Sequence, residues 1–244
     1  MKKFLSLFLV ALVMFGCVDK KVTDNTTPQE KYNKTIQALN NLDSYEMDLT
    51  MDISLDEADY DTEIGINMKV EDAKNEQGPN SMITMSADEQ SVTYFIKDGY
   101  VYMDMLGMKI KMPATSDDTN FSENMGLEEL SEGMIERLES FTTKDGFKLM
   151  VKCNKDELEA LSWTEEVRSQ FSEYELELKG SLLSFEVTSD YNIKQIILSY
   201  DMELKEAGSS ETFDANFTIT LDYKGHNATK IEYPTDLDSY MLTE

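Results

Sequence analysis

The sequence predicts an α+β fold in which about three helices cover the apolar face of one large, curved antiparallel sheet. Long segments alternate strictly between apolar and polar residues, which is the pattern of a strand with one face in water. Two apolar runs joined by Lys97-Asp98-Gly99 predict a β-hairpin, and the third strand that follows completes a meander from Ser91 to Pro113. Three other segments have apolar residues at helical spacing, so strands and helices alternate along the chain in blocks.

The first helix is predicted from about Thr27 to Leu42. Thr27-Pro28-Gln29-Glu30 is a capping box with proline at the first helical position, and apolar residues recur behind it at helical spacing. From Tyr45 the period changes to two, which predicts a pair of strands, and a weaker strand from Ser81 to Ala87 leads into the meander. The acidic segment between this pair is interpreted as a solvated hairpin turn, because it lacks the glycine and the terminal glutamate of an EF-hand loop.

Two further helices are expected after the meander, on either side of a strand from Asp145 to Val151. The apolar residues of the first are Leu127, Leu130, Met134, Leu138 and Phe141. Those of the second are Leu158, Leu161, Val167 and Phe171, with Trp163 near that side. The last third alternates again, which predicts at least three long strands up to Tyr223.

The N-terminus has the features of an export signal. Lys2 and Lys3 precede an uncharged apolar run that is too short to span a bilayer. Gly16-Cys17 follows, and a small residue before cysteine resembles the bacterial lipobox, which implies a diacylated Cys17 at the mature N-terminus. We therefore expect a signal peptide at 1–16, a polar tether at 17–26 and one domain at 27–244, held on the extracytoplasmic face of a cell membrane. An ordinary secretory signal with an incidental cysteine is the alternative.

The composition excludes several functions. With 22 basic and 48 acidic residues the formal net charge is −26, which disfavours nucleic acid as a partner. Neither an enzyme nor a cofactor is predicted: His226 is the only histidine and stands in no nucleophile motif, and metal-ligand spacings are absent. Cys153 has no histidine to activate it, so we interpret it as a small buried strand residue.

The chain is rich in methionine, with 16 residues. Strand parity places several of them in apolar surroundings, and six methionines together with one isoleucine form the candidate ligand-lining set: Met47, Met51, Met68, Met103, Met108, Ile110 and Met112. Flexible thioether side chains suit a surface that accommodates variable shapes. Simple core filling and Cu(I) binding are the other readings of the same pattern.

The helix-to-strand junction from Ala38 to Tyr45 and the hairpin from Phe95 to Tyr102 resemble bacterial lipoproteins of the LolA/LppX type and a related Gram-positive group. The resemblance implies a half-barrel closed by helices, with an apolar cavity for acyl chains and no catalytic residues. The expected function is therefore an anchored lipoprotein that binds a hydrophobic ligand, in first place a lipid. The alternative is a non-enzymatic envelope protein with a packed core, whose acidic surface binds a protein partner of unknown identity.

Overall fold

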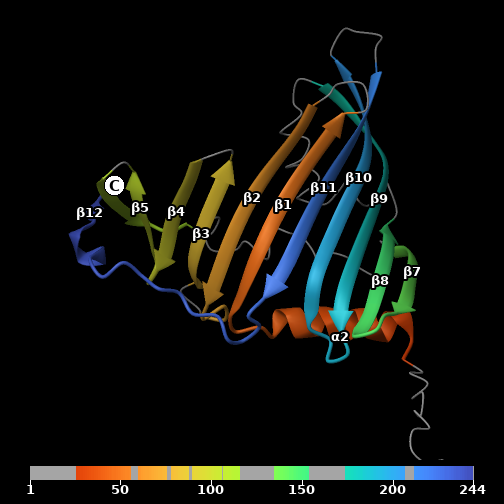
Figure 1. Ribbon diagram of the computed structural model, residues 1–244, viewed down its shortest axis with the longest axis horizontal. Helices are drawn as coiled ribbons and strands as arrows, with labels where there is room; N and C mark the ends of the chain where they lie inside the picture. Colours follow the sequence, from red (N-terminus) through yellow and green to blue (C-terminus); the bar gives the residue numbers. More distant parts are fainter. Residues whose placement is uncertain are drawn as a thin grey trace, which may run out of the picture.

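The structure is a computed structural model of the chain. It describes residues 26–55, 60–75, 78–87, 90–105, 107–115, 135–153, 174–206 and 212–243. These residues form one open sheet of twelve strands in the order β12-β6-β5-β4-β3-β2-β1-β11-β10-β9-β8-β7. All neighbouring pairs are antiparallel except β12 with β6. The sheet and the helix α2, which crosses one end of its long strands, are shown in Figure 1.

The strands fall into two antiparallel runs along the chain. The first run is β1 (Tyr45–Leu55), β2 (Tyr60–Glu71), β3 (Asn80–Ala87), β4 (Gln90–Lys97), β5 (Tyr100–Met105) and β6 (Met108–Pro113). The second run is β7 (Ile135–Thr142), β8 (Gly146–Cys153), β9 (Tyr174–Thr188), β10 (Ile193–Glu206) and β11 (Thr212–Lys224). The 3₁₀ turn η2 (Leu237–Ser239) and β12 (Met241–Leu242) end the chain.

The helix α2 (Pro28–Asn40) begins at the capping box that the sequence predicts. The Thr27 side chain accepts a hydrogen bond from the Glu30 backbone N–H at 3.2 Å, and the Glu30 carboxylate accepts one from the Thr27 N–H at 2.8 Å. Such a cap stabilises a helix by about 1 kcal/mol. Asn41 closes the other end.

The central hairpin turns at Asp98 and Gly99, as the sequence predicts. Both residues have positive φ, 51° and 77°, which is the geometry of a type I′ turn. The next reversal includes Gly107 at φ 87°. Two tight turns therefore hold β4, β5 and β6 in one meander.

Pairing between β1 and β11 joins the two runs into a single sheet. Met47 lies opposite Tyr223, and Leu49 lies opposite Leu221. Local alternation predicts both strands, but it does not indicate that they pair.

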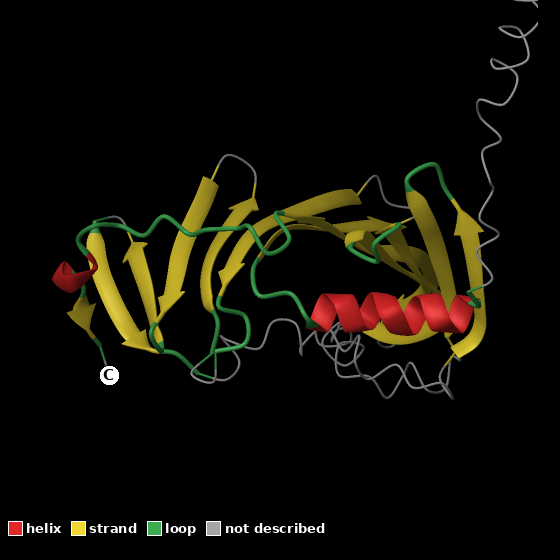
Figure 2. Ribbon diagram, turned by 90° about the horizontal axis from the view of Figure 1, so that it is seen from below, coloured by secondary structure: helices red, strands yellow, loops and turns green. Residues whose placement is uncertain are grey.

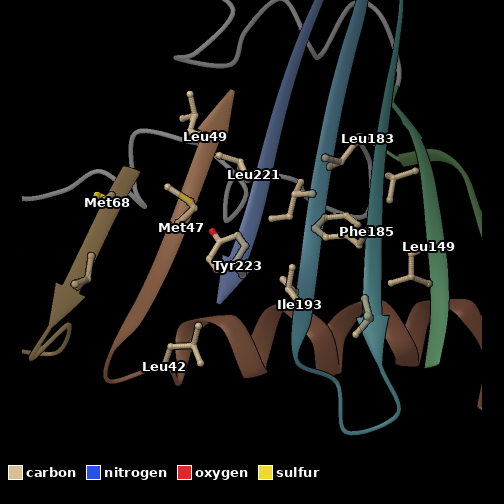
Figure 3. Packing of buried hydrophobic residues seen from close by; sticks show 14 of the residues in the cluster. Leu42, Met47, Leu49, Met68, Leu149, Leu183, Phe185, Ile193, Leu221 and Tyr223 are labelled. Carbon is tan, nitrogen blue, oxygen red and sulfur yellow. The ribbon is translucent and has the colours of Figure 1, made fainter. Parts of the chain in front are cut away.

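One face of the sheet, which we call the inner face, carries the main core. Its buried members include Met47, Leu49, Met68, Phe185 and Leu221, all at 3% exposure or less. Figure 3 shows these side chains gathered above α2. Tyr32 of the helix packs edge-on against Phe185, with 5.8 Å between ring centroids, so α2 lies on the inner face.

The opposite, outer face is polar over the central strands and aromatic near one edge. Asn67 donates to Glu46 at 3.2 Å and to Asp48 at 2.6 Å, and Lys224 pairs with Asp48. The hydrogen bond and charge of Lys224 hold the pKa of the Asp48 carboxyl below its ordinary value. Charged side chains of β1, β2 and β11 therefore collect on the outer face.

The C-terminal segment crosses this outer face and reaches the far edge of the sheet. Tyr233 packs against Phe95 with 5.9 Å between centroids, and Tyr240 packs against Tyr102 at 5.6 Å. The sequence after Tyr223 is too short and mixed to predict an element, so this cover over the aromatic residues of β4 and β5 does not follow from the sequence.

The expectation of about three helices is wrong for the described chain, which contains one α-helix and the turn η2. Leu138 and Phe141, expected on a helix, lie in strand β7. A bulge between Ile135 and Arg137 lets Ile135 and Leu138 both pair with inner-face residues of β8, so a strand shows apolar residues three apart. Leu127, Leu130 and Met134 of the same expected helix fall outside the described residues, as do the helix expected around Trp163 and residues 1–25.

Candidate functional site

The candidate site is the inner face of the first run of strands, and the sheet register determines which residues share it. One row across the sheet runs through Tyr223, Met47, Met68, Ile83, Tyr94, Met103 and Ile110. The next row contains Val70, Ser81, Ile96, Val101 and Met112. Four of the seven candidate ligand-lining residues therefore lie in one continuous row.

Exposure divides the candidates into two groups. Met47 and Met68 are buried, at 1% and 2% exposure, and belong to the packed core. Met51, Met103, Ile110 and Met112 are half-buried on the same face. Met108 is 62% exposed, so the expectation of apolar surroundings is wrong there, because Met108 begins β6 at the hairpin tip beside Gly107. Cys17 lies outside the described residues.

Beyond Met68 the inner face reaches solvent. Ile64, Met85 and Val92 are 38%, 43% and 48% exposed. They are register neighbours: Met85 pairs with Val92 and with Ile66, which stands two residues after Ile64. We call the six residues of this region the open inner face: Ile64, Ile66, Met85, Val92, Tyr94 and Met103.

Apolar side chains on the other half of the sheet are much less exposed to solvent. Leu149, Phe185 and Ile196 on β8, β9 and β10 are at most 1% exposed. Figure 2 shows α2 on the concave side of these strands and no described helix on that side of β3, β4 and β5. The helix therefore lies over only one end of the inner face, and the uncovered apolar surface is at the other end.

The inner face of the first run is uncharged. Lysine, aspartate and glutamate at described positions of β2 to β6 have outer-face parity, as Lys69 and Asp104 illustrate. The inner-face positions whose side chains are described carry apolar residues together with Ser81, Tyr94 and, at the start of β1, Tyr45. Burial raises the pKa of Tyr45 to about 12, so its phenol is neutral at pH 7. Non-covalent contact with an apolar molecule is the chemistry that such a surface offers.

The titratable groups near α2 do not form a reactive centre. Burial raises the pKa of the Cys153 thiol to about 11, so it is protonated at neutral pH and a poor nucleophile. The His226 Nε2 lies 2.7 Å from the Ile193 carbonyl oxygen, and its ring stacks on Tyr223. Within the described ranges, three or more histidine, cysteine, aspartate or glutamate side chains nowhere gather as a metal site.

Sequence reasoning missed the exposed members of this surface. Met85 is not in the candidate ligand-lining set, and the alternation of β3 is weaker than that of its neighbours because Met82 stands on its outer face. Parity indicates which face is apolar. It does not indicate where the cover ends, because that depends on α2.

Comparison with known proteins gives structural neighbours only. No family model matches the chain, and no curated protein matches it. LprF from Mycobacterium bovis has 8% identity and a TM-score of 0.47, and the match covers 85% of this chain and 96% of LprF. The lipoprotein LppX from Mycobacterium tuberculosis has 10% identity and a TM-score of 0.46, covering 84% and 97%.

A LolA superfamily protein from Nitrosomonas europaea has 11% identity and a TM-score of 0.31, covering 84% of this chain and 95% of its own. The structural neighbours thus include LppX, LprF and a LolA superfamily protein, the group that the sequence motifs resemble. Among the described residues, no helix has the length and apolar character needed to span a bilayer.

Proposed function

We propose that this chain is a membrane-anchored, extracytoplasmic lipoprotein that binds a hydrophobic molecule, in first place the acyl chains of a lipid, on its open inner face. The observation that carries the proposal is the uncharged inner face that continues from the packed core at Met68 to side chains 38–48% exposed at Ile64, Met85 and Val92.

The energetic reason is the cost of leaving such a surface in water. Burial of apolar surface contributes roughly 25 cal/mol per Å². Contiguous exposed apolar patches on soluble proteins commonly mark a binding site. In a chain of net charge −26, an uncharged surface of this extent stands out from its surroundings. Met85 and Met103 add side chains that adapt to ligands of different shape.

The lipid anchor expected from the sequence supports the same proposal. Lys2 and Lys3, the apolar run and Gly16-Cys17 form the lipoprotein signal, and helix α2 begins at Pro28. A protein held at a membrane by acyl chains on Cys17 meets lipid as its most abundant apolar partner. Changing Cys17 to serine should move the protein from the membrane fraction into the medium or periplasm. Retention on the membrane after a salt wash contradicts the anchor.

Uptake of a fluorescent fatty acid from solution tests the ligand. Met85→Asp places a charge on the open inner face, and Ser86→Asp places the same charge on the exposed opposite face of the same strand. We expect Met85→Asp to weaken uptake by about tenfold, because a carboxylate is costly to bury against an acyl chain. Ser86→Asp should bind as the parent does. Equal affinity for all three proteins refutes the assigned surface.

Two other experimental results would favour the alternative functions, protein binding and Cu(I) binding. A parent protein without fatty acid uptake favours a packed inner face and a protein partner on the acidic outer face, where Asp48 and Glu46 stand. Stoichiometric Cu(I) uptake that Met103→Leu abolishes favours the thioether reading, since leucine preserves the volume and removes only the sulfur.

A further inference from the structure

The edge of the sheet formed by β6 and β12 carries three strongly exposed apolar side chains. Met108, Met241 and Leu242 are 62%, 64% and 60% exposed, the highest values among large apolar residues in the described chain. We call these three residues the edge patch. Figure 2 shows this edge, with the C-terminus, at the opposite end of the molecule from the start of α2.

Two members of the edge patch, Met108 and Met241, continue the inner face, and the third, Leu242, lies on the outer-face side of the same edge. The short strand β12 pairs in parallel with β6, so that Met241 lies opposite Ile110 and Leu242 opposite Lys111. The Thr243 N–H donates to the Lys111 carbonyl oxygen at 2.8 Å and fixes this register. Ile110 in turn pairs with Met103 of the open inner face. Apolar residues therefore run from the inner face to Met241 at the margin of the sheet, and Leu242 extends them around the edge.

Tyrosine and lysine side chains flank the edge patch on its outer-face side, where Leu242 pairs with Lys111. The Lys111 Nζ lies over the Tyr100 ring at 5.3 Å from its centroid, and the Lys109 Nζ lies over the Tyr240 ring at 5.7 Å. Lys109 also pairs with Asp236. Exposed aliphatic tips beside tyrosine rings and long lysine stems have the composition of a membrane interface, where lysine extends its ammonium group to water.

We infer that the edge patch docks on the surface of a lipid bilayer, and that a hydrophobic molecule passes at this edge between the bilayer and the open inner face. This inference rests on the proposed function. A second copy of the chain is the other apolar occupant for such an edge, but two molecules of net charge −26 repel each other. An acylated Cys17 instead holds the edge at a high effective concentration near lipid.

The geometry also determines how the molecule lies on the bilayer. From Cys17 to Thr26 the chain can span at most about 30 Å. The start of α2 lies at the β7 side, and β12 is eleven strand spacings away, which is roughly 50 Å at about 4.8 Å each. The tether is shorter than the sheet is wide. Both ends therefore reach the membrane only if the strand order is inclined towards the bilayer surface and does not stand perpendicular to it.

Flotation with phosphatidylcholine vesicles tests the docking, with the unacylated Cys17→Ser chain as parent. Zwitterionic lipid avoids repulsion of the acidic protein. The test variant adds Met241→Asp and Leu242→Asp, and the matched control adds Thr142→Asp and Thr143→Asp, two exposed residues at the opposite edge. We expect vesicle binding to fall by about tenfold or more in the test variant and to be unchanged in the control.

Fatty acid uptake from solution separates this inference from the proposed function. The test variant should take up free fatty acid as the parent does, since the open inner face is intact. Vesicle binding without fatty acid uptake by the parent refutes the proposed function and leaves the docking in place. A parent that does not float, or a test variant that floats equally well, overturns the docking. A parent dimer in sedimentation that Leu242→Asp alone dissociates also overturns it, in favour of a second copy.

Discussion

Truncation of two methionines on the inner face should show which of them belongs to the packed core and which to the ligand-binding surface. Met68 and Met85 both belong to the inner face, on neighbouring strands, but their exposures are 2% and 43%. Met68→Ala removes a fully buried side chain and leaves a cavity, which costs about 2–5 kcal/mol. Met85→Ala removes a side chain that already contacts water, so we expect a cost of about 1 kcal/mol or less.

Urea unfolding followed by circular dichroism measures both values, provided that the slope of the free energy against denaturant is the same for the variants. Fatty acid uptake by the same proteins should show the reverse order, with Met85→Ala weakened more than Met68→Ala. If Met85→Ala loses as much stability as Met68→Ala, the open inner face is packed core, and the reasoning that assigns a ligand to it fails.

Two further predictions concern the second run of strands and the pH dependence of stability. Gly146→Ala should lower the free energy of unfolding, measured in urea, by about 2 kcal/mol or more, because an added Cβ collides with the Val187 backbone carbonyl. Gly65→Ala is the control and should be nearly neutral, because a Cβ at Gly65 meets nothing within 4 Å. Burial raises the pKa of Cys153 from 9.0 to about 11 and that of Tyr45 from 10.0 to about 12, so the unfolded chain loses these protons first. Melting temperatures should therefore fall as the pH rises from about 9 towards 11, and a flat profile there contradicts the burial of both groups.

Much of the secondary structure could be predicted because it depends on local patterns. The capping box at Thr27, the turn at Asp98-Gly99 and the alternation in β1 each involve residues close in sequence. Strand β7 was missed because its bulge breaks the two-residue period. The pairing of β12 with β6 was missed because two residues carry no measurable period.

The candidate site could be predicted only as a face. Alternation indicates that Met47 and Met103 lie on the apolar side, and the register confirms it. It does not distinguish the buried Met47 from the exposed Met85, because the difference comes from where α2 and the second run of strands lie. Burial of this kind is a long-range property. The residues near either methionine in the sequence do not determine how far its side chain is buried.

The junction of β1 with β11 has a consequence for how the chain folds. Each run of strands is built from hairpins between neighbours, whereas Asp48 and Lys224 at this junction are 176 positions apart. Contacts between neighbours form quickly, and contacts across such a distance form slowly. We expect two nearly complete half-sheets to form before the last long strand joins them. Until then each half-sheet has an unpaired edge and an uncovered apolar face, and a state of this kind is prone to aggregate. A chain cut short before Thr212 lacks the strand that joins the halves, so it should aggregate rather than fold into a smaller version of the protein.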